Sequence, residues 1–471
     1  MGERPRVGLL LLAGDSWWEA GVCDAPSGPY TGFLDHLENA AASIAAALAT
    51  HFDVVSSGLL HTAEQTVEEA RRFDAEHVDA VIVCPVVWTN DPPLVAFLKE
   101  ARRVPTLLWA YDPYDGLLEY FRVPEWLRAS GPVSVQQCSP ILRRLGWHYE
   151  VVFGNENDER TMREVEAFAS AAAVKSNLVG TRIAVVPSPC RVIVGSWVDE
   201  MHLLERFGVE LLYVPVEQLA GLMESAPESK AADYVEWLKE NCTVVDVSDD
   251  VLLRSARQSL ALVQLVEKHG LAGIALDDFA EDVVRLLGFR PHLYHPSLGE
   301  LGCTVGLEAD VPGVLATIVL SRLAGTMGTF NELFTIDREQ NVLLMGHPGM
   351  GELGVGDPET FTVTPDLEFD ESQKRGAWVS YRAKPGPMTF LNMTPGPEGL
   401  EMTAFSGQSL PGPRVMEGYA HMIVAPEGDA LALFKGAVKR GLLQHWGTVH
   451  GDILPELRYL AGMLGFDLHI L

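Results

Sequence analysis

Short apolar runs alternate with amphipathic stretches of helical length over the first third of the chain. The runs predicted as buried strands cover residues 7–12, 53–59, 80–86, 106–111 and 149–153. Such alternation is typical of βαβ units, in which helices connect the strands of a parallel sheet. One helix start is marked locally, because Thr62 followed by Gln65 forms a capping-box pattern. This part of the chain is therefore predicted to be an α/β domain.

The same alternation begins again after a predicted helix over residues 159–177. The elements predicted there are strands over 182–187, 209–214 and 271–276, with helices over 196–207 and 277–287. They indicate a second α/β domain. Beyond residue 325, β-rich segments and Gly/Pro turns predict a third, largely antiparallel domain. The predicted domains are residues 1–177, 178–325 and 326–471.

Charge and cysteine content narrow the possible functions. The chain has 471 residues, with 64 Asp and Glu against 35 Lys and Arg, which gives a formal net charge of −29. Because such a charge repels phosphate backbones and anionic lipids, we expect neither nucleic acid nor membrane as a partner. The six cysteines are widely spaced and form no Cys-x-x-Cys pair. This spacing fits a reduced, cytoplasmic compartment.

Two acidic residues lie in unusual apolar surroundings. Glu308 is predicted to begin an apolar helix over residues 308–320, where free backbone N–H groups of the first turn favour an anion. Glu332 interrupts the apolar strand pattern between Phe330 and Phe334. Each also has an ordinary explanation, a charge at a helix start for Glu308 and a solvent-facing strand position for Glu332.

Three histidines add candidate ligands. His347 ends an apolar run and is expected at a strand tip, although a lone histidine is more often an ordinary core or surface residue. His445 and His450 are predicted to lie in a compact loop ahead of the final helix. Carboxylates and imidazoles together suit Mn²⁺, Co²⁺ or related octahedral divalent ions. Such an ion bound to adjacent sugar oxygens would stabilise an enediolate while a carboxylate moves the proton.

Three blocks of the chain resemble the L-arabinose isomerase and L-fucose isomerase family of metal-dependent aldose–ketose isomerases. The first comprises residues 54–59 and 79–83. The second is Glu308-Ala309-Asp310, which is similar to the family's acidic motif, with Glu332 and His347 following at near-family spacing. The third, residues 445–452, begins with His445, which best matches the family's C-terminal histidine ligand.

The resemblance implies an α/β fold with two Rossmann-like parallel-sheet domains followed by an antiparallel β-rich C-terminal domain. It implies Mn²⁺, or another divalent ion such as Co²⁺ or Mg²⁺, bound by Glu308, Glu332, His347 and His445. Glu308 and Glu332 would also be the catalytic acid and base, in an order that the sequence leaves open. It further implies a homotrimer or homohexamer whose active sites include loops of a neighbouring subunit.

The segments expected to contact the sugar depart from the family pattern. The substrate-binding candidates are Trp17, Trp18, Asp112, Gln136 and His450. We therefore expect a cytoplasmic sugar isomerase with an altered sugar-contacting rim, acting on a small-molecule sugar. The alternatives are a sugar-binding relative that does not isomerise, and a metal-assisted epimerase or lyase acting on a sugar acid.

Overall fold

The computed structural model describes residues 4–348, 352–367 and 376–471. The chain divides into two compact units, residues 2–176 and residues 177–471, and each is described by itself. No helix within the described residues combines the length and hydropathy that crossing a bilayer requires.

The N-terminal unit contains a five-stranded parallel sheet in the order β2-β1-β3-β4-β5. Its strands are β1 (Arg6–Leu12), β2 (Asp53–Leu60), β3 (Ala80–Pro85), β4 (Thr106–Tyr111) and β5 (Tyr149–Gly154). Every residue of β3 and β4 is buried, as expected for parallel strands covered on both faces. The five strands predicted in this region are confirmed, with ends shifted by at most one residue.

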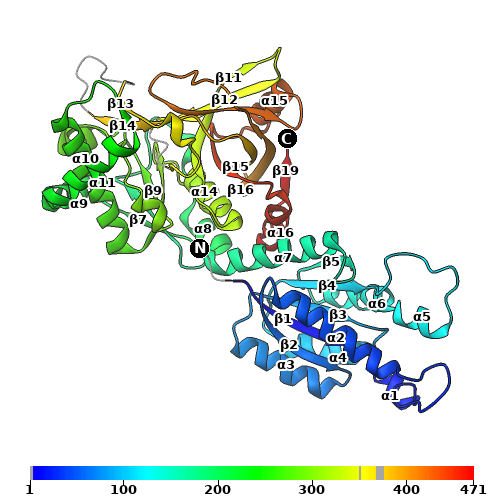
Figure 1. The fold of residues 1–471 in the computed structure, drawn as a ribbon. Coiled ribbons are helices and arrows are strands. Elements are labelled where there is room, and N and C mark those ends of the chain that lie inside the picture. The colour runs from blue at the N-terminus through cyan, green and yellow to red at the C-terminus, as the bar shows by residue number, and fades with distance from the viewer. Residues whose placement is uncertain (1–3, 349–351, 368–375) are drawn as a thin grey trace. The chain divides into compact units, whose positions relative to one another are not determined.

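Helices connect these strands (Figure 1). They are α1 (Ser16–Glu19), α2 (Phe33–Ala49), α3 (Ala63–Ala75), α4 (Asp91–Glu100), α5 (Val123–Arg128) and α6 (Gly131–Arg144), followed by α7 (Glu159–Leu178). The predicted capping box begins α3: the Thr62 hydroxyl accepts the Gln65 N–H at 3.3 Å, and the Gln65 side chain accepts the Thr62 N–H at 3.1 Å.

The second unit begins with a four-stranded parallel sheet in the order β10-β9-β6-β7. Its strands are β6 (Arg182–Val186), β7 (Glu210–Tyr213), β9 (Leu271–Leu276) and β10 (Thr304–Leu307). The associated helices are η1 (Val194–Ser196), α8 (Glu200–Phe207), α9 (Val216–Ser225), α10 (Glu228–Asn241), α11 (Asp249–His269), α12 (Glu281–Leu287), α13 (Ser297–Glu300) and α14 (Val311–Ala324). The helix predicted to begin at Asp277 begins only at Glu281, because Asp277 and Asp278 belong to the loop after β9.

The rest of the unit is β-rich. Seven strands form one sheet in the order β15-β18-β11-β12-β17-β16-β19, and β15 also pairs with β16, so that the sheet closes on itself. These strands are β11 (Thr329–Asp337), β12 (Val342–His347), β15 (Gly386–Gly396), β16 (Gly399–Ser409), β17 (Ala420–Pro426), β18 (His445–His450) and β19 (Leu468–Ile470). All their pairings are antiparallel except β16 with β19. The predicted fold class, parallel α/β sheets followed by an antiparallel β-rich region, is confirmed.

Smaller elements complete this region. A three-stranded sheet contains β8 (Thr243–Val244), β13 (Thr362–Pro365) and β14 (Ala377–Ser380). The remaining helices are η2 (Pro358–Thr360), α15 (Ala430–Arg440) and α16 (Leu454–Leu464). The domain boundaries at residues 177 and 325 stay predictions.

One prediction for this region is wrong. Residues 445–450 were expected to form a loop, but they form β18, which lies between β11 and β15. The aromatic and β-branched residues Trp446, Thr448 and Val449 favour a strand there. Gly447 allows a close approach to α14, since a Cβ at this position would lie 2.6 Å from the Thr317 backbone nitrogen.

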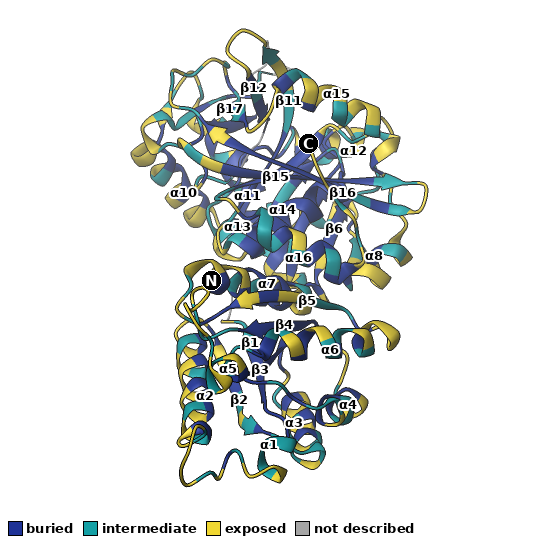
Figure 2. Cartoon of the chain, turned by 90° about the vertical axis from the view of Figure 1, so that its right-hand side faces the viewer, coloured by how far each residue is buried: buried dark blue, intermediate teal, exposed yellow. Residues whose placement is uncertain are grey.

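Helix α14 connects the two main sheets of the second unit. It packs against β9 and β10 of the parallel sheet and against β15 and β18 of the closed sheet. Figure 2 shows α14 and the middle of β15 coloured mainly as buried. The loop from β10 into α14 therefore lies beside the start of β18.

Candidate metal centre

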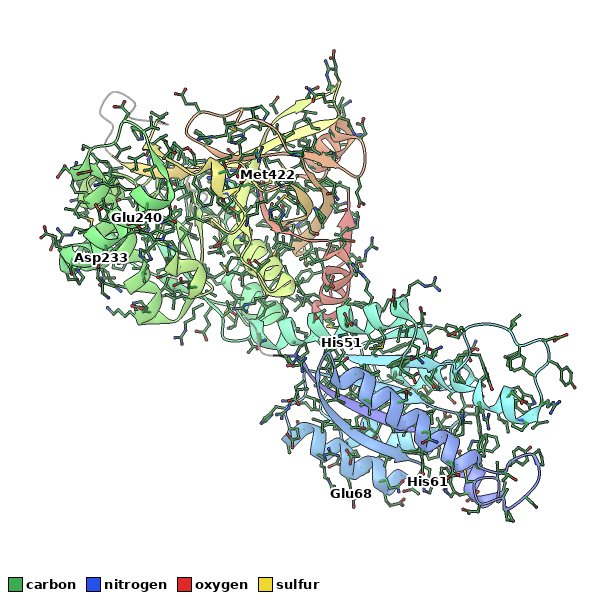
Figure 3. The ribbon with its side chains drawn as sticks, viewed as in Figure 1. His51, His61, Glu68, Asp233, Glu240 and Met422 are labelled. Atoms are coloured by element: carbon green, nitrogen blue, oxygen red, sulfur yellow. The ribbon has the colours of Figure 1, made fainter. Side chains whose placement is uncertain are left out.

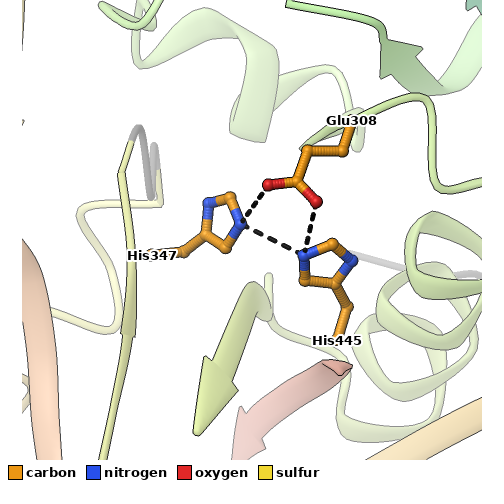
Figure 4. A group of neighbouring side chains, drawn as sticks. All are labelled: Glu308, His347 and His445. Atoms are coloured by element: carbon orange, nitrogen blue, oxygen red, sulfur yellow. Dashed lines mark hydrogen bonds and ion pairs between the residues drawn. The ribbon is translucent and has the colours of Figure 1, made fainter. Parts of the chain in front are cut away.

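Three of the four predicted metal ligands meet in one buried cluster (Figure 4). Glu308 follows the end of β10, His347 is the last residue of β12, and His445 is the first residue of β18. One ligand atom from each lies within 4.8 Å of the others. His445 Nε2 is 3.3 Å from Glu308 Oε2 and 3.3 Å from His347 Nε2, and His347 Nε2 is 3.9 Å from Glu308 Oε1.

Glu332 approaches this cluster from β11. Strand register pairs Glu332 with Gly346 of β12 on one side and with His445 of β18 on the other. Glu332 Oε2 lies 3.9 Å from His445 Nε2, outside the tight group of three, and its side chain is 26% exposed. Burial, together with the negative charge of Glu308, raises the pKa of the Glu332 carboxyl.

Glu308 is held in an unusual backbone conformation. The φ angles of Glu308 and Ala309 are 59° and 47°, in the left-handed region that residues other than glycine rarely adopt. The expectation that Glu308 begins a helix is wrong, because α14 begins at Val311 and its N-cap is Asp310. The side chain of Glu308 is therefore placed by this loop and not by the first helical turn.

Asp310 both caps helix α14 and contacts the candidate ligand His445. Its Oδ1 accepts the backbone N–H of Gly313 at 2.9 Å and so caps α14. Its Oδ2 lies 2.7 Å from His445 Nδ1, and neither side chain is exposed. Asp310 is not among the residues predicted for the site, although an Asp directly before Val311-Pro312 is a recognisable helix-start signal.

The two imidazoles are oriented by their second ring nitrogens. Asp310 engages Nδ1 of His445, and the Pro348 carbonyl lies 2.8 Å from Nδ1 of His347, where it accepts the ring N–H. Both Nε2 atoms therefore face the Glu308 carboxylate. This arrangement is typical of histidines that bind metals, where a hydrogen bond to one nitrogen fixes the tautomer that leaves the other free to coordinate.

Burial and neighbouring charges give the three side chains different pKa values in the metal-free protein. Burial, with the adjacent charge of His445, lowers the pKa of His347 to about 4. Burial acts on His445 in the same sense, but its carboxylate partners Asp310 and Glu308 outweigh it and raise the pKa to about 10. Burial would raise the pKa of Glu308, yet the contacts with His445 and His347 lower it.

The donor set fits a divalent cation. Two convergent imidazole nitrogens and a carboxylate suit borderline ions such as Mn²⁺, Co²⁺ or Zn²⁺. The ring of Phe330 packs against His347 and His445, with centroid separations of 5.0 and 4.3 Å, and so keeps one side of the cluster apolar. A possible metal site is thus present, while the identity of its ion stays a prediction.

Four of the five predicted substrate-binding residues belong to the N-terminal unit, and the fifth is His450 of β18. Trp17 and Trp18 follow β1: Trp17 donates its indole N–H to the Trp88 carbonyl at 2.8 Å, and Trp18 stacks on His61 at 4.1 Å. His61, labelled in Figure 3, also lies 2.8 Å from Asp15.

The remaining two N-terminal candidates have different settings. Asp112 follows β4 and accepts the Tyr114 N–H at 3.1 Å, whereas Gln136 is exposed on α6. Three of the four candidates, Trp17, Trp18 and Asp112, follow the carboxyl ends of parallel strands, the usual ligand-binding edge of such a sheet. Their contact with a sugar stays a prediction.

His450 is at the opposite end of β18 from His445. Its Nε2 lies 3.3 Å from the Val355 carbonyl. The two histidines are five positions apart along the strand, which separates them by roughly 17 Å, and this odd spacing places them on opposite faces of the sheet. His450 is therefore not part of the cluster around Glu308.

Fold and cluster together describe a class of protein: an α/β protein with a buried carboxylate–imidazole site at the junction of a parallel and an antiparallel sheet. No protein-family model matches the chain. Curated relatives do match it over most of its length. A protein named sulfoquinovose isomerase from Priestia megaterium (strain ATCC 12872 / QMB1551) is 22% identical over 415 residues, which cover 85% of this chain and 88% of the relative.

Two further relatives carry the same name. The protein from Clostridium sp. (strain MSTE9) is 24% identical over 463 residues, which cover 92% of this chain and 96% of the relative. The protein from Alkalicoccus urumqiensis is 21% identical over 391 residues, covering 81% and 84%. The prediction of an enzyme of the aldose–ketose isomerase class is confirmed by these relatives. The finer resemblance to L-arabinose and L-fucose isomerases stays a prediction, because the relatives carry another name.

Proposed function

We propose that the protein is a metal-dependent aldose–ketose isomerase whose divalent ion, Mn²⁺ or alternatively Co²⁺ or Mg²⁺, is held by Glu308, His347 and His445, with Glu332 as a fourth ligand. The observation that carries the proposal is the convergence of two buried Nε2 atoms and one carboxylate from three distant strand ends. When bound, the ion supplies positive charge that stabilises the enediolate of the sugar.

The two carboxylates have different roles in this proposal. Glu308 belongs to the tight cluster and its charge is engaged by both histidines. Glu332 lies at the margin, is more exposed and has a raised pKa, so it is better suited to take a proton from one sugar carbon and return it to the neighbouring one. We therefore assign proton transfer to Glu332 and charge stabilisation to Glu308.

The relatives' name supports a finer proposal for the substrate. Sulfoquinovose is an aldose that carries a sulfonate, and we propose an aldose of this kind ahead of L-arabinose or L-fucose. The departures from the L-arabinose isomerase pattern around Trp17, Asp112 and Gln136 are consistent with a different sugar. The sugar contacts of the N-terminal unit, the homotrimeric or homohexameric assembly and the cytoplasmic location belong to the same proposal.

The test uses the purified chain freed of metal with a chelator and reloaded with Mn²⁺. Sulfoquinovose, L-arabinose and L-fucose are incubated with it in deuterated water, and the products are identified by NMR. The expected result is metal-dependent formation of a ketose from one sugar, with deuterium at C2 of the re-formed aldose. Loss of a group from the sugar, or inversion without a carbonyl shift, would favour the lyase or epimerase alternative. Binding without turnover would favour a non-isomerising relative.

A further inference from the structure

A chain of buried side chains connects the small three-stranded sheet to the metal-ligand loop. Asp278 follows β9, and its Oδ1 accepts the backbone N–H of Glu308 at 3.1 Å. Its Oδ2 lies 3.3 Å from His292 Nε2, and His292 Nδ1 lies 3.3 Å from Asp366 Oδ2. The His292 ring stacks on Trp378 of β14, with centroids 5.6 Å apart and planes inclined by 13°.

These contacts leave Asp278 little freedom. The side chains of His292 and Asp278 are 0% and 3% exposed, and that of Asp366 is 11% exposed. The His292 imidazole lies between the carboxylates of Asp278 and Asp366 and stacks on the Trp378 indole. It thereby fixes the plane of the Asp278 carboxylate. With one oxygen committed to His292, the other is directed at the Glu308 N–H.

The loop that receives this hydrogen bond has a conformation that it would not hold alone. Glu308 and Ala309 both have positive φ, in the left-handed region that carries a conformational cost for residues other than glycine. Two contacts with the end of β9 oppose this cost: Glu308 N–H to Asp278, and Ala309 N–H to the Leu276 carbonyl at 2.9 Å. The second is a main-chain contact, so only the first depends on a side chain.

We propose that Asp278 is a positioning residue for the metal centre: it holds the Glu308 backbone in the left-handed conformation that aims the carboxylate at His347 and His445, and His292 holds Asp278. This inference rests on the proposed function, because it takes Glu308 as a metal ligand. Neither Asp278 nor His292 touches the metal or the sugar in this account. Their effect is on the alignment of Glu308.

The test measures Mn²⁺ binding to the metal-free chain by calorimetry and by the Mn²⁺ electron paramagnetic resonance spectrum. Asp278→Ala should weaken binding by about 10- to 100-fold and change the spectrum, as loss of an outer partner of a metal ligand typically does. Asp282→Ala is the matched control, because this exposed aspartate pairs only with Arg285 at the surface of α12 among the described contacts. It should bind Mn²⁺ like the parent.

A rescue variant separates positioning from general destabilisation. Ala309→Gly relieves the cost of a positive φ, so Asp278→Ala with Ala309→Gly should bind Mn²⁺ more tightly than Asp278→Ala alone. If Asp278 only stabilised the fold, Ala309→Gly would not restore Mn²⁺ binding. If Asp278→Ala does not fold, His292→Gln takes its place and should weaken binding about three- to ten-fold, a smaller loss because the Asp278 acceptor remains.

The outcomes distinguish the two proposals. If the parent chain binds no Mn²⁺, the proposed function fails. If the parent binds Mn²⁺ and Asp278→Ala, or His292→Gln in its place, binds it equally with the same spectrum, the positioning role is overturned while the metal centre stands. Weaker binding without recovery in the glycine double variant also overturns the backbone mechanism.

Discussion

His445 Nδ1 and Asp310 Oδ2 are 2.7 Å apart, and both side chains are fully buried. The same aspartate caps α14 through its other oxygen, so the start of a core helix and the orientation of a candidate metal ligand depend on one carboxylate. Because Asp310 holds the Nδ1–H of His445, the Nε2 atom is directed toward Glu308 and His347. The helix start is thereby coupled to the site.

Asp310→Asn should weaken metal binding with little loss of fold. Asparagine caps helices about as well as aspartate. As a neutral group, however, it orients the His445 ring less firmly and stabilises the charged imidazole less. We expect Mn²⁺ affinity, measured by calorimetry, to fall about 10- to 100-fold. The control is Asp429→Asn, since Asp429 caps α15 by accepting the Ala432 N–H and lies outside the cluster. Equal effects of the two substitutions would contradict the assigned role.

Glu332→Gln should abolish most turnover while the fold stays intact. An amide cannot move a proton, and loss of a general base typically lowers kcat about 10²- to 10⁴-fold. Steady-state kinetics of the isomerisation, with circular dichroism as the check on folding, measure this. Glu352→Gln is the matched control, because Glu352 is a partly buried carboxylate that accepts the Gly354 N–H, whereas Glu332 lies 3.9 Å from His445 Nε2. A similar loss in both variants would remove the special role of Glu332.

Metal binding should release a proton near neutral pH. The pKa of His445 is raised to about 10 in the metal-free protein, so its imidazole is charged at pH 7.5 and must lose a proton to coordinate an ion. His347, with its pKa lowered to about 4, is already neutral and releases none. Calorimetric titrations of Mn²⁺ in buffers of different ionisation enthalpy should report about one proton released per ion. A value of zero would contradict the pKa of His445.

The stability of the metal-free protein should fall at alkaline pH. His292 and His445 have folded-state pKa values raised to about 9 and about 10 because their carboxylate partners outweigh the effect of burial. Groups with raised pKa stabilise the fold fully below the unfolded value of about 6.5 and lose that contribution as pH rises through the folded value. The melting temperature of the chelated chain should therefore decrease between pH 7 and pH 10. A constant or increasing value would contradict the two buried ion pairs.

Gly447→Ala should destabilise the junction between β18 and α14. The added Cβ would lie 2.6 Å from the Thr317 nitrogen, a backbone atom that cannot move independently. Overpacking of this kind costs about 1–3 kcal/mol, and moving β18 would also displace His445. Thermal unfolding and Mn²⁺ titration should both be affected. Gly428→Ala, where nothing lies within 4 Å of the new Cβ, should change neither measurably.

Local pattern was sufficient for much of the fold but not for β18. The buried runs of β3 and β4 are short, apolar and bounded by turns, and periodicity alone identified them. Residues 445–450 contain two histidines and a glycine, so no apolar alternation is visible. Their strand conformation depends on pairing with β11 and β15, whose residues are distant in the sequence.

The candidate site, like the fold, was predictable from the sequence only in part. Spacing and resemblance singled out Glu308, His347 and His445, but the positive φ of Glu308 and its anchor Asp278 are products of tertiary contacts between loops. His450 is close to His445 in sequence, yet strand geometry separates them. Closeness in sequence therefore wrongly suggested that His450 shares the site with His445. The contacts by which Asp310 and Asp278 orient the ligands depend on the folded chain.

The metal centre can be tested by locating Mn²⁺ through anomalous X-ray scattering in crystals of the metal-loaded chain. We expect one strong peak per chain bounded by Glu308 Oε, His347 Nε2 and His445 Nε2, with Glu332 beside it. The absence of a peak there, or a peak that contacts none of these four side chains, would contradict the metal centre and the isomerase mechanism built on it.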